Sequence, residues 1–249
     1  MHKTKPLLSI ITVTRNAERT LPSTLASLDA QTCRLFEHII IDGASTDSTV
    51  EQAGKFAAPN RTIISEPDHG LYDAMNKGLG MAEGDYVMFL NAGDTLHSKD
   101  TLEIIANAAM DNDYPGIIYG QTEIVDSEGK TLGPRHLTAP ETLTLESFSQ
   151  GMTVCHQAFV VLRKLTNNFD IHYKYSSDYE WCIRCLQRSH RNFYTGTTVI
   201  NYLNEGLTTN HKWASLMERF SIMSHYYGLL PTIFRHFGFA VRAFKRKSI

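Results

Sequence analysis

The first half of the chain alternates short apolar runs with longer stretches in which apolar residues recur every three or four positions. The runs are rich in β-branched residues, as in buried strands, whereas the longer stretches have the spacing of amphipathic helices. Such alternation predicts βαβ units with right-handed crossovers and a mainly parallel sheet. The predicted strands are 7–14, 37–45, 61–67 and 85–94, and the predicted helices are 21–31, 46–57, 70–84 and 99–110.

The second half of the chain is less regular. Two apolar segments surround a Ser-Glu-Gly turn in residues 116–133, as in a β-hairpin. Residues 152–164 are strand-like through their apolar centre, and residues 177–189 have apolar positions at helical spacing. From Trp213 to the end of the chain we expect helices.

Composition narrows the class of protein. The chain has 249 residues, 42% hydrophobic and 20% charged, which is typical of a soluble globular protein. Its formal net charge of −2 gives no reason to expect nucleic acid as a partner. Four cysteines are too few for a disulfide scaffold, and no signal-peptide pattern is visible, so a cytoplasmic location is predicted. Because no linker or repeat divides the chain, we predict a domain at 1–210 and a C-terminal helical appendage at 211–249.

Polar turns follow all four predicted strands of the first half. In open parallel sheets, ligands bind where the carboxyl ends of the strands meet such turns. Asp42 ends an apolar strand, and a carboxylate there can accept a hydrogen bond from a nucleobase. Thr12, Thr14 and Asn16 offer further hydrogen bonds beside it. Capping of the next helix is the simpler interpretation of the serine, threonine and aspartate at 45–47.

The turn "NAGD" at 91–94 brings together the side-chain oxygens of Asn91 and Asp94. Hard cations such as Mg²⁺ or Mn²⁺ take oxygen ligands, and substrate phosphates often complete their coordination. The turn is therefore interpreted as half of a cation site whose other half is a nucleotide diphosphate. A plain Asn-Ala-Gly-Asp turn accounts for the same residues equally well.

The motifs "SIITVTRN", "IIIDGASTD", "GLYDAMNKG" and "YVMFLNAGD", in this order, resemble the inverting family 2 glycosyltransferases with the GT-A fold. The run "SEPDHGLYDAMNKG", followed by "CHQAFV" and "SDYEW", resembles the colanic-acid-type branch that builds bacterial surface polysaccharides. The resemblance covers residues 7–210. It implies a Rossmann-like α/β fold and an inverting hexosyltransferase that moves a sugar from a nucleotide, usually UDP, to a lipid-linked glycan.

The resemblance also implies roles for matching residues. Asp178 matches the general base, which takes the proton of the acceptor hydroxyl. Asp94 matches the ligand of the metal, Mn²⁺ or Mg²⁺, although Asn91 and Gly93 replace two acids usual in that turn. Met75 stands where many members have arginine. The nucleotide is expected at Thr12, Thr14, Asn16, Asp42, Asp68 and Asn76, the donor sugar and diphosphate at Tyr72, Asp73 and Asn91, and the acceptor at His156 and Gln157.

The C-terminal tail combines positive charge with an apolar stripe. From Trp213 onward it carries one acid, Glu218, against six lysines and arginines. A basic amphipathic helix of this kind binds an anionic membrane surface, so we predict contact with the inner face of the cytoplasmic membrane. Packing on the transferase domain, or on a partner subunit in a homo-oligomer, is the alternative. The apolar stripe would consist of Phe234, Phe237, Val241 and Phe244.

Two other functions compete with glycosyl transfer. A sugar-nucleotide-binding protein without turnover is suggested by the acid-poor turn at 91–94. A nucleotidyltransferase would need a glycine-rich phosphate loop with basic residues near the amino end. The segment "TVTRNAERT" contains no glycine, so that function is disfavoured.

Overall fold

The computed structural model describes residues 5–204 and 212–247. The side chains of residue 212 and of residues 240–247 are not part of the description, so Val241 and Phe244 of the predicted apolar stripe lie outside it.

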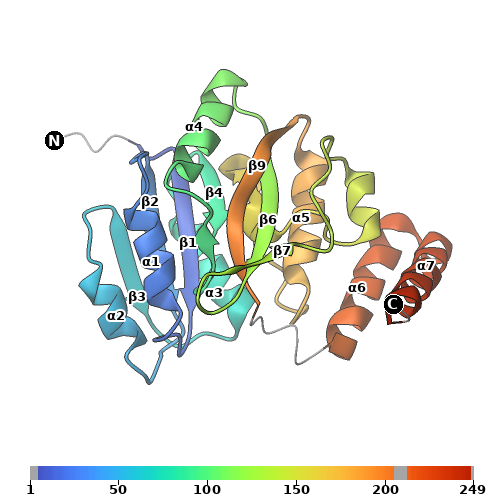
Figure 1. Ribbon diagram of the computed structural model, residues 1–249, viewed down its shortest axis with the longest axis horizontal. Helices are drawn as coiled ribbons and strands as arrows, with labels where there is room; N and C mark the ends of the chain where they lie inside the picture. Colours follow the sequence, from blue (N-terminus) through green and yellow to red (C-terminus); the bar gives the residue numbers. More distant parts are fainter. Residues whose placement is uncertain (1–4, 205–211, 248–249) are drawn as a thin grey trace.

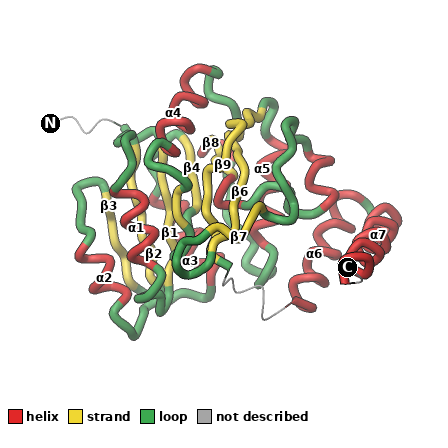
Figure 2. Tube along the Cα trace, in the orientation of Figure 1, coloured by secondary structure: helices red, strands yellow, loops and turns green. Residues whose placement is uncertain are grey.

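One mixed β-sheet forms the centre of the molecule (Figures 1 and 2). Within the described residues the strand order is β3-β2-β1-β4-β8-β6-β9-β5, and β7 pairs with β6 outside this path. The strands are β1 (Leu8–Thr14), β2 (Phe36–Asp42), β3 (Arg61–Ser65), β4 (Tyr86–Phe89), β5 (Thr95–Leu96), β6 (Ile117–Val125), β7 (Thr131–Pro134), β8 (Phe159–Leu162) and β9 (Asn192–Leu203).

The first half of the chain forms the predicted parallel part of the sheet. Strand β1 pairs in parallel with both β2 and β4, and β2 pairs in parallel with β3. The alternation expected from the sequence is thus confirmed, and the polar turns after these strands lie along one edge. The intervening helices are α1 (Leu21–Asp29), α2 (Thr49–Lys55), α3 (Leu71–Met81) and α4 (Thr101–Asp111).

The second half adds antiparallel pairs and one strand that the sequence did not predict. Strand β8 lies antiparallel between β4 and β6, and β6 and β7 form the expected hairpin. The unpredicted strand, β9, pairs in parallel with β6 and antiparallel with the short β5, which the sequence did not predict either.

The expectation of a strand through residues 152–164 is correct only for its second half. Strand β8 begins at Phe159, and residues His156–Ala158 form a 3₁₀ turn before it. The amide of Ala158 donates to the carbonyl of Cys155 at 2.9 Å, a local bond that a strand would not make. This turn directs the side chains of His156 and Gln157 toward the end of β4, where Asn91 and Asp94 lie.

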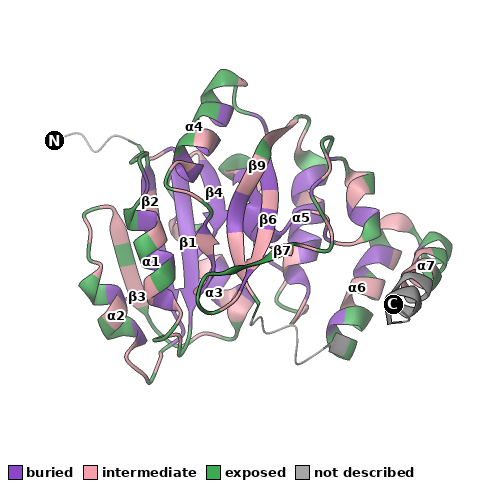
Figure 3. Cartoon of the chain, in the orientation of Figure 1, coloured by how far each residue is buried: buried purple, intermediate pink, exposed green. Residues whose placement is uncertain are grey.

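The hydrophobic core lies on both faces of the central strands, which are almost entirely buried (Figure 3). An aromatic cluster joins β4 and β8 to helix α5 (Ser177–Arg188). The ring of Trp181 stacks on Phe169 at 5.0 Å between centroids and meets Phe89 edge to face at 5.6 Å. Burying these large rings stabilises the position of α5, whose first turn carries Asp178.

The last two helices, α6 (Lys212–Tyr227) and α7 (Leu229–Lys247), lie at the end of the molecule away from β3 (Figure 1). Gly228, with φ of 88°, separates them in a conformation that favours glycine. None of the described helices combines the length and the apolar character needed to cross a bilayer.

Candidate active site

A cleft of about 730 Å³ opens at the edge of the sheet where β1 and β4 end. Its walls come from the loop after β1, the start of α3, the turn after β4, the 3₁₀ turn before β8, the first turn of α5 and the middle of α6. The predicted site residues that line it are Thr14, Asn16, Asp68, Tyr72, Asn91, Asp94, His156, Gln157 and Asp178. A smaller cavity near the amino ends of β1 and β4 contains none of them.

Asp178 lies in the first turn of α5, and three groups hold its carboxylate. The hydroxyl of Tyr72 donates to Oδ1 at 3.1 Å, and the Tyr179 amide donates to the same oxygen at 2.9 Å. His156 Nδ1 lies 3.2 Å from Oδ2. Burial raises the pKa of Asp178, but the hydrogen bond from His156, the charge of Arg219 and the hydrogen bond from the Tyr179 amide together outweigh it, so this pKa lies below the usual aspartate value. The carboxylate is therefore ionised at neutral pH, as a proton acceptor must be.

His156 connects Asp178 to the turn after β4. Its Nε2 lies 3.3 Å from the side-chain amide nitrogen of Asn91. Because an amide nitrogen only donates, Nε2 accepts this hydrogen bond, and Nδ1 carries the hydrogen that points to Asp178. His156 is 8% exposed, so its orientation is set by these two polar contacts and the surrounding packing.

Asp94 is held more tightly than an ordinary turn residue. Gln157 Nε2 donates to Oδ2 at 2.6 Å, and the Leu203 amide donates to Oδ1 at 2.9 Å. The residue is 4% exposed, and this burial raises the pKa of Asp94 to about 6 despite the two hydrogen bonds. Desolvation therefore outweighs hydrogen bonding, and a nearby positive charge would favour the ionised form.

The oxygens of this turn are suited to a hard cation, but only together with further ligands. Asn91 Oδ1 is buried and has no hydrogen-bond partner among the described residues, and Asp94 supplies the carboxylate. Across the described residues, no three His, Cys, Asp or Glu side chains gather closely enough to hold a metal. Mg²⁺ is commonly bound by one or two carboxylates with substrate phosphates and water. Asn91 and Asp94 fit that pattern.

The opposite end of the cleft contains polar groups suited to a nucleoside. The Oγ1 atom of Thr14 is buried without a hydrogen-bond partner in the described structure. Asn16, with φ of 50°, accepts the Thr46 amide at 2.9 Å and thereby joins the loops after β1 and β2. A Cβ at Gly43 would lie 2.2 Å from Asp68 Oδ2, so a larger residue at this position would displace that carboxylate.

Two predicted nucleotide contacts lie behind the wall of the cleft. Asp42 is 1% exposed, and its Oδ2 accepts the Ser45 amide at 2.9 Å and the Ser65 hydroxyl at 2.7 Å. Thr12 is fully buried and donates to the Leu90 carbonyl at 2.7 Å. In this arrangement both residues shape the loops that line the cleft, and direct contact with a nucleobase stays a prediction.

Two residues of α3 also lie outside the lining of the cleft. Asn76 donates to the Phe169 carbonyl at 3.0 Å and accepts the Phe169 amide at 2.7 Å, so it holds the loop before α5. Asp73 accepts the His69 amide at 3.0 Å at the start of the helix. Their predicted roles toward the nucleotide and the donor sugar likewise stay predictions.

The cleft also contains basic residues that sequence reasoning did not select. Arg15 follows Thr14 directly, so its place in the polar turn after β1 was a usable signal. The others come from segments without regular patterning or from the C-terminal helices, where the sequence provides no such signal. These residues are Arg135, Lys174 and Arg219.

Comparison with known sequences gives a consistent result. Residues 9–168 match the family model for Glycosyl transferase family 2. The chain is 34% identical over 188 residues to the PGL/p-HBAD biosynthesis glycosyltransferase of Mycobacterium bovis, covering 73% of this chain and 70% of that protein. It is 26% identical over 214 residues to the amylovoran biosynthesis glycosyltransferase AmsB of Erwinia amylovora, covering 78% of this chain and 68% of that protein.

Solved structures share the fold. The S. aureus TarS fragment in complex with UDP-GlcNAc matches with a TM-score of 0.72 and 20% identity, over 93% of this chain and 73% of that one. The mannosyltransferase PcManGT of Pyrobaculum calidifontis, in complex with GDP-Man and Mn²⁺, matches with a TM-score of 0.63 and 16% identity, over 96% and 76%. These likenesses confirm the predicted GT-A fold with C-terminal helices.

Proposed function

The chain belongs to glycosyltransferase family 2, and from that premise we propose an inverting hexosyl transfer from a nucleoside diphosphate sugar to a hydroxyl group of a growing glycan. One observation supports this proposal most strongly. The ionised Asp178 lines the same 730 Å³ cleft as Thr14, Asp68 and Asp94, so one sugar nucleotide can reach all four residues.

In the proposed reaction, the acceptor hydroxyl attacks the anomeric carbon on the face opposite the diphosphate. The hydroxyl must lose a proton as the new bond forms, and Asp178 accepts it, which contributes roughly 10²–10⁴-fold to the rate. Tyr72 and His156 keep the carboxylate in place through their bonds of 3.1 and 3.2 Å. Attack on that face inverts the configuration at the anomeric carbon.

We place the donor nucleoside at Thr14, Asn16 and Asp68, and the diphosphate beside Asn91 and Asp94. UDP is the proposed nucleotide, and the TarS structure with UDP-GlcNAc is an example of this fold with that ligand. Asn91 and Asp94 would hold a Mg²⁺ or Mn²⁺ ion, which supplies positive charge that stabilises the diphosphate.

The proposed acceptor is a lipid-linked glycan of a bacterial surface polysaccharide, in the colanic-acid-type branch. Relatives named for amylovoran and PGL/p-HBAD biosynthesis support a cell-surface product. We propose that residues 211–249 form an appendage to the domain at 1–210 and hold the enzyme at the inner face of the cytoplasmic membrane. Phe234 and Phe237 of α7 are 75% and 73% exposed, as an apolar membrane contact requires.

The test of the reaction compares the parent chain with Asp178→Asn. Binding of UDP, UDP-GlcNAc, UDP-glucose and GDP-mannose is measured by calorimetry, and donor turnover is measured with and without Mn²⁺. We expect the variant to lose turnover by at least about 100-fold while keeping its nucleotide affinity, because it retains the shape of the side chain but not the proton acceptor. Nucleotide binding without turnover in the parent, across donors and glycan acceptors, would instead indicate a binding protein.

The membrane proposal is tested by flotation with vesicles containing phosphatidylglycerol. The double variant Phe234→Glu with Phe237→Glu should lose most of the vesicle binding, and vesicles of phosphatidylcholine alone should bind the parent weakly. If the parent does not float but the double variant converts a dimer to a monomer in gel filtration, α7 is a subunit interface instead.

A further inference from the structure

The wall of the cleft around Asp178 is rich in positive charge that the described protein does not neutralise. Arg135, Lys174 and Arg219 all line the cleft with Asp178. In the portion of the chain that the structure describes, none of the three forms an ion pair within 4 Å of a carboxylate. The carboxylates that line the cleft have other partners: Asp178 contacts His156, Asp94 accepts from Gln157 and Asp68 accepts the Gly70 amide. This imbalance points to an anionic ligand.

Arg219 has a buried hydrogen-bond donor that no acceptor of the described structure satisfies. Its Nε is buried and has no hydrogen-bond partner within residues 5–204 and 212–247. A buried donor without an acceptor is costly, and more so when the donor is charged. The next residue toward the amino end, Glu218, accepts the main-chain amides of Lys174 and Tyr175 at 2.8 and 2.9 Å. These bonds hold the middle of α6 against the loop that leads to Asp178.

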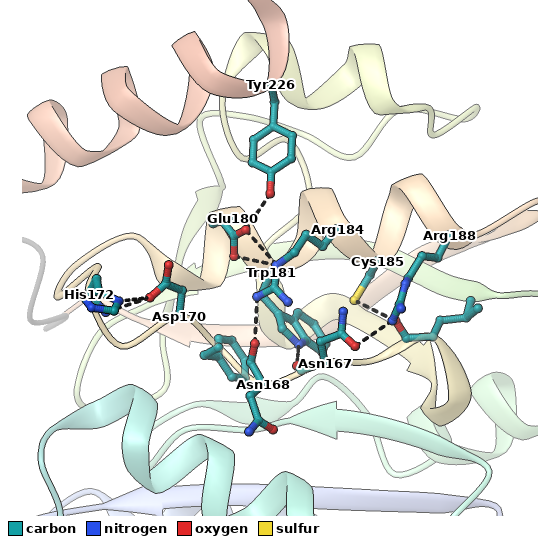
Figure 4. A network of polar contacts seen from close by, with 12 residues as sticks. Asn167, Asn168, Asp170, His172, Glu180, Trp181, Arg184, Cys185, Arg188 and Tyr226 are labelled. Carbon is teal, nitrogen blue, oxygen red and sulfur yellow. Dashed lines mark hydrogen bonds and ion pairs between the residues drawn. The ribbon is translucent and has the colours of Figure 1, made fainter.

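Helix α6 is also anchored further along its length (Figure 4). The hydroxyl of Tyr226 donates to Glu180 at 2.6 Å, and Glu180 accepts two bonds of 2.8 Å from Arg184. Glu180 is 6% exposed and lies two residues after Asp178. Helix α6, which carries Arg219, is therefore bonded both to α5 and to the loop that leads into it.

Arg135 is positioned from the other side of the same wall. Its Nη1 donates to the Met152 carbonyl at 2.7 Å, in the segment that leads to His156. This bond uses one of the five N–H groups of the guanidinium, so the rest can contact a ligand in the cleft.

The position of Arg219 distinguishes the acceptor from the donor. Inversion requires the base and the attacking hydroxyl on one face of the sugar and the leaving diphosphate on the other. Arg219 is one of the charges that lower the pKa of Asp178, so it acts on the side of the base. By itself such a cation weakens the base, because it favours the deprotonated carboxylate. A negative charge on the acceptor would offset this effect.

We infer that the acceptor carries an anionic group, a phosphate or a carboxylate, close to its reacting hydroxyl, and that Arg219, Arg135 and Lys174 bind this group. The inference rests on the proposed glycosyl transfer and names the substrate class of its acceptor. A sugar phosphate and a uronic acid are the two sources of this charge.

The test uses the full chain with saturating UDP, so that the nucleotide site is filled. Glucose, glucuronate and glucose 1-phosphate are titrated by ligand-observed NMR. We expect at least one anionic probe to bind about tenfold more tightly than glucose, and the better probe identifies the charged group. Arg219→Gln and Arg135→Gln should each remove most of this difference in affinity, and Arg219→Lys should retain part of it. The control is Lys99→Gln, which removes an exposed cation outside the cleft and should have no effect.

Other outcomes overturn the inference in distinct ways. If the parent binds UDP but binds the anionic probes no better than glucose, the acceptor inference is wrong and the donor function stands. If Arg219→Gln weakens UDP binding about tenfold and leaves the anionic probes unaffected, Arg219 contacts the donor diphosphate and the inference is again wrong. If the parent binds no nucleotide, the proposed function fails, and the inference fails with it. Circular dichroism spectra that match the parent confirm that each variant is folded.

Discussion

Replacing His156 by leucine should shift the pH dependence of transfer. In the parent, His156 Nδ1 donates to Asp178 Oδ2 at 3.2 Å, and this contact helps to hold the pKa of Asp178 below the usual aspartate value. Leucine has a similar volume but no donor. The ionised carboxylate of the variant loses this support, and its pKa rises.

The usual strength of a hydrogen bond to a charged group sets the size of this shift. A hydrogen bond to a charged group contributes roughly 1.5–3 kcal/mol, and one pKa unit corresponds to about 1.4 kcal/mol. The acid limb of kcat/KM, which reports the base of the free enzyme, should therefore move up by about one to two pH units. For the same reason the stabilising effect of the contact, present above the pKa of the unfolded chain, is lost as pH falls through the pKa of the folded state.

The assay is a pH profile of kcat/KM between pH 4.5 and 8 for the parent, His156→Leu and His156→Asn. The parent should lose activity below about pH 6 only through Asp94, His156→Leu should lose activity more steeply over the same range, and the two should approach each other at pH 8. His156→Asn is the matched control, because its amide nitrogen lies near the position of Nδ1 and should restore part of the shift. Loss of activity by one factor at every pH, with the limb unmoved, would refute the reasoning and assign His156 another role.

Three further outcomes follow from buried groups. Burial raises the pKa of Asp94 to about 6, so the folded chain keeps a proton that the unfolded chain releases near pH 4. The free energy of unfolding should therefore fall by about 3 kcal/mol between pH 4 and 7. Urea titrations of the parent should show this pH dependence, and those of Asp94→Asn should lack it. Tyr226→Phe removes a 2.6 Å bond to the buried Glu180 and should lower the free energy of unfolding by about 1–2 kcal/mol, with UDP affinity unchanged in calorimetry. Iodoacetamide at pH 8 should label only the half-buried Cys33 of the folded chain, because the other three thiols are buried and burial raises the pKa of Cys155 to about 11. Rapid labelling of Cys155, detected by mass spectrometry, would contradict this packing.

The first half of the fold could be predicted because its signals are local. Strands β1 to β4 are short apolar runs, and the helices between them have apolar residues at helical spacing. Alternation of strands and helices along the chain predicts parallel pairing of the strands. By contrast, β9 has mostly half-buried side chains, and its register on β6 shifts near Gln121, so no regular pattern marks it.

The candidate site likewise contains residues whose position the sequence predicted and residues whose position it did not. Residues in the turns after strands, such as Asp68 and Asp94, reach the cleft because parallel strands end at one edge. Asp42 also ends a strand, yet its carboxylate bonds to Ser45 and Ser65 instead of lining the cleft. The direction of a side chain at a strand end depends on its neighbours in space, and the spacing of residues along the chain does not identify these neighbours.

The sequence by itself determined the alternating architecture, the four polar turns at one sheet edge and the membership of a glycosyltransferase family, because each depends on residues that are close together in the chain. Only the tertiary structure decided which groups meet across the cleft. His156 reaches Asp178 through a 3₁₀ turn, and Arg219 reaches the same wall from a C-terminal helix. These contacts join segments that are 22 and 41 positions apart, and they are set by packing and by hydrogen bonds that no local pattern encodes.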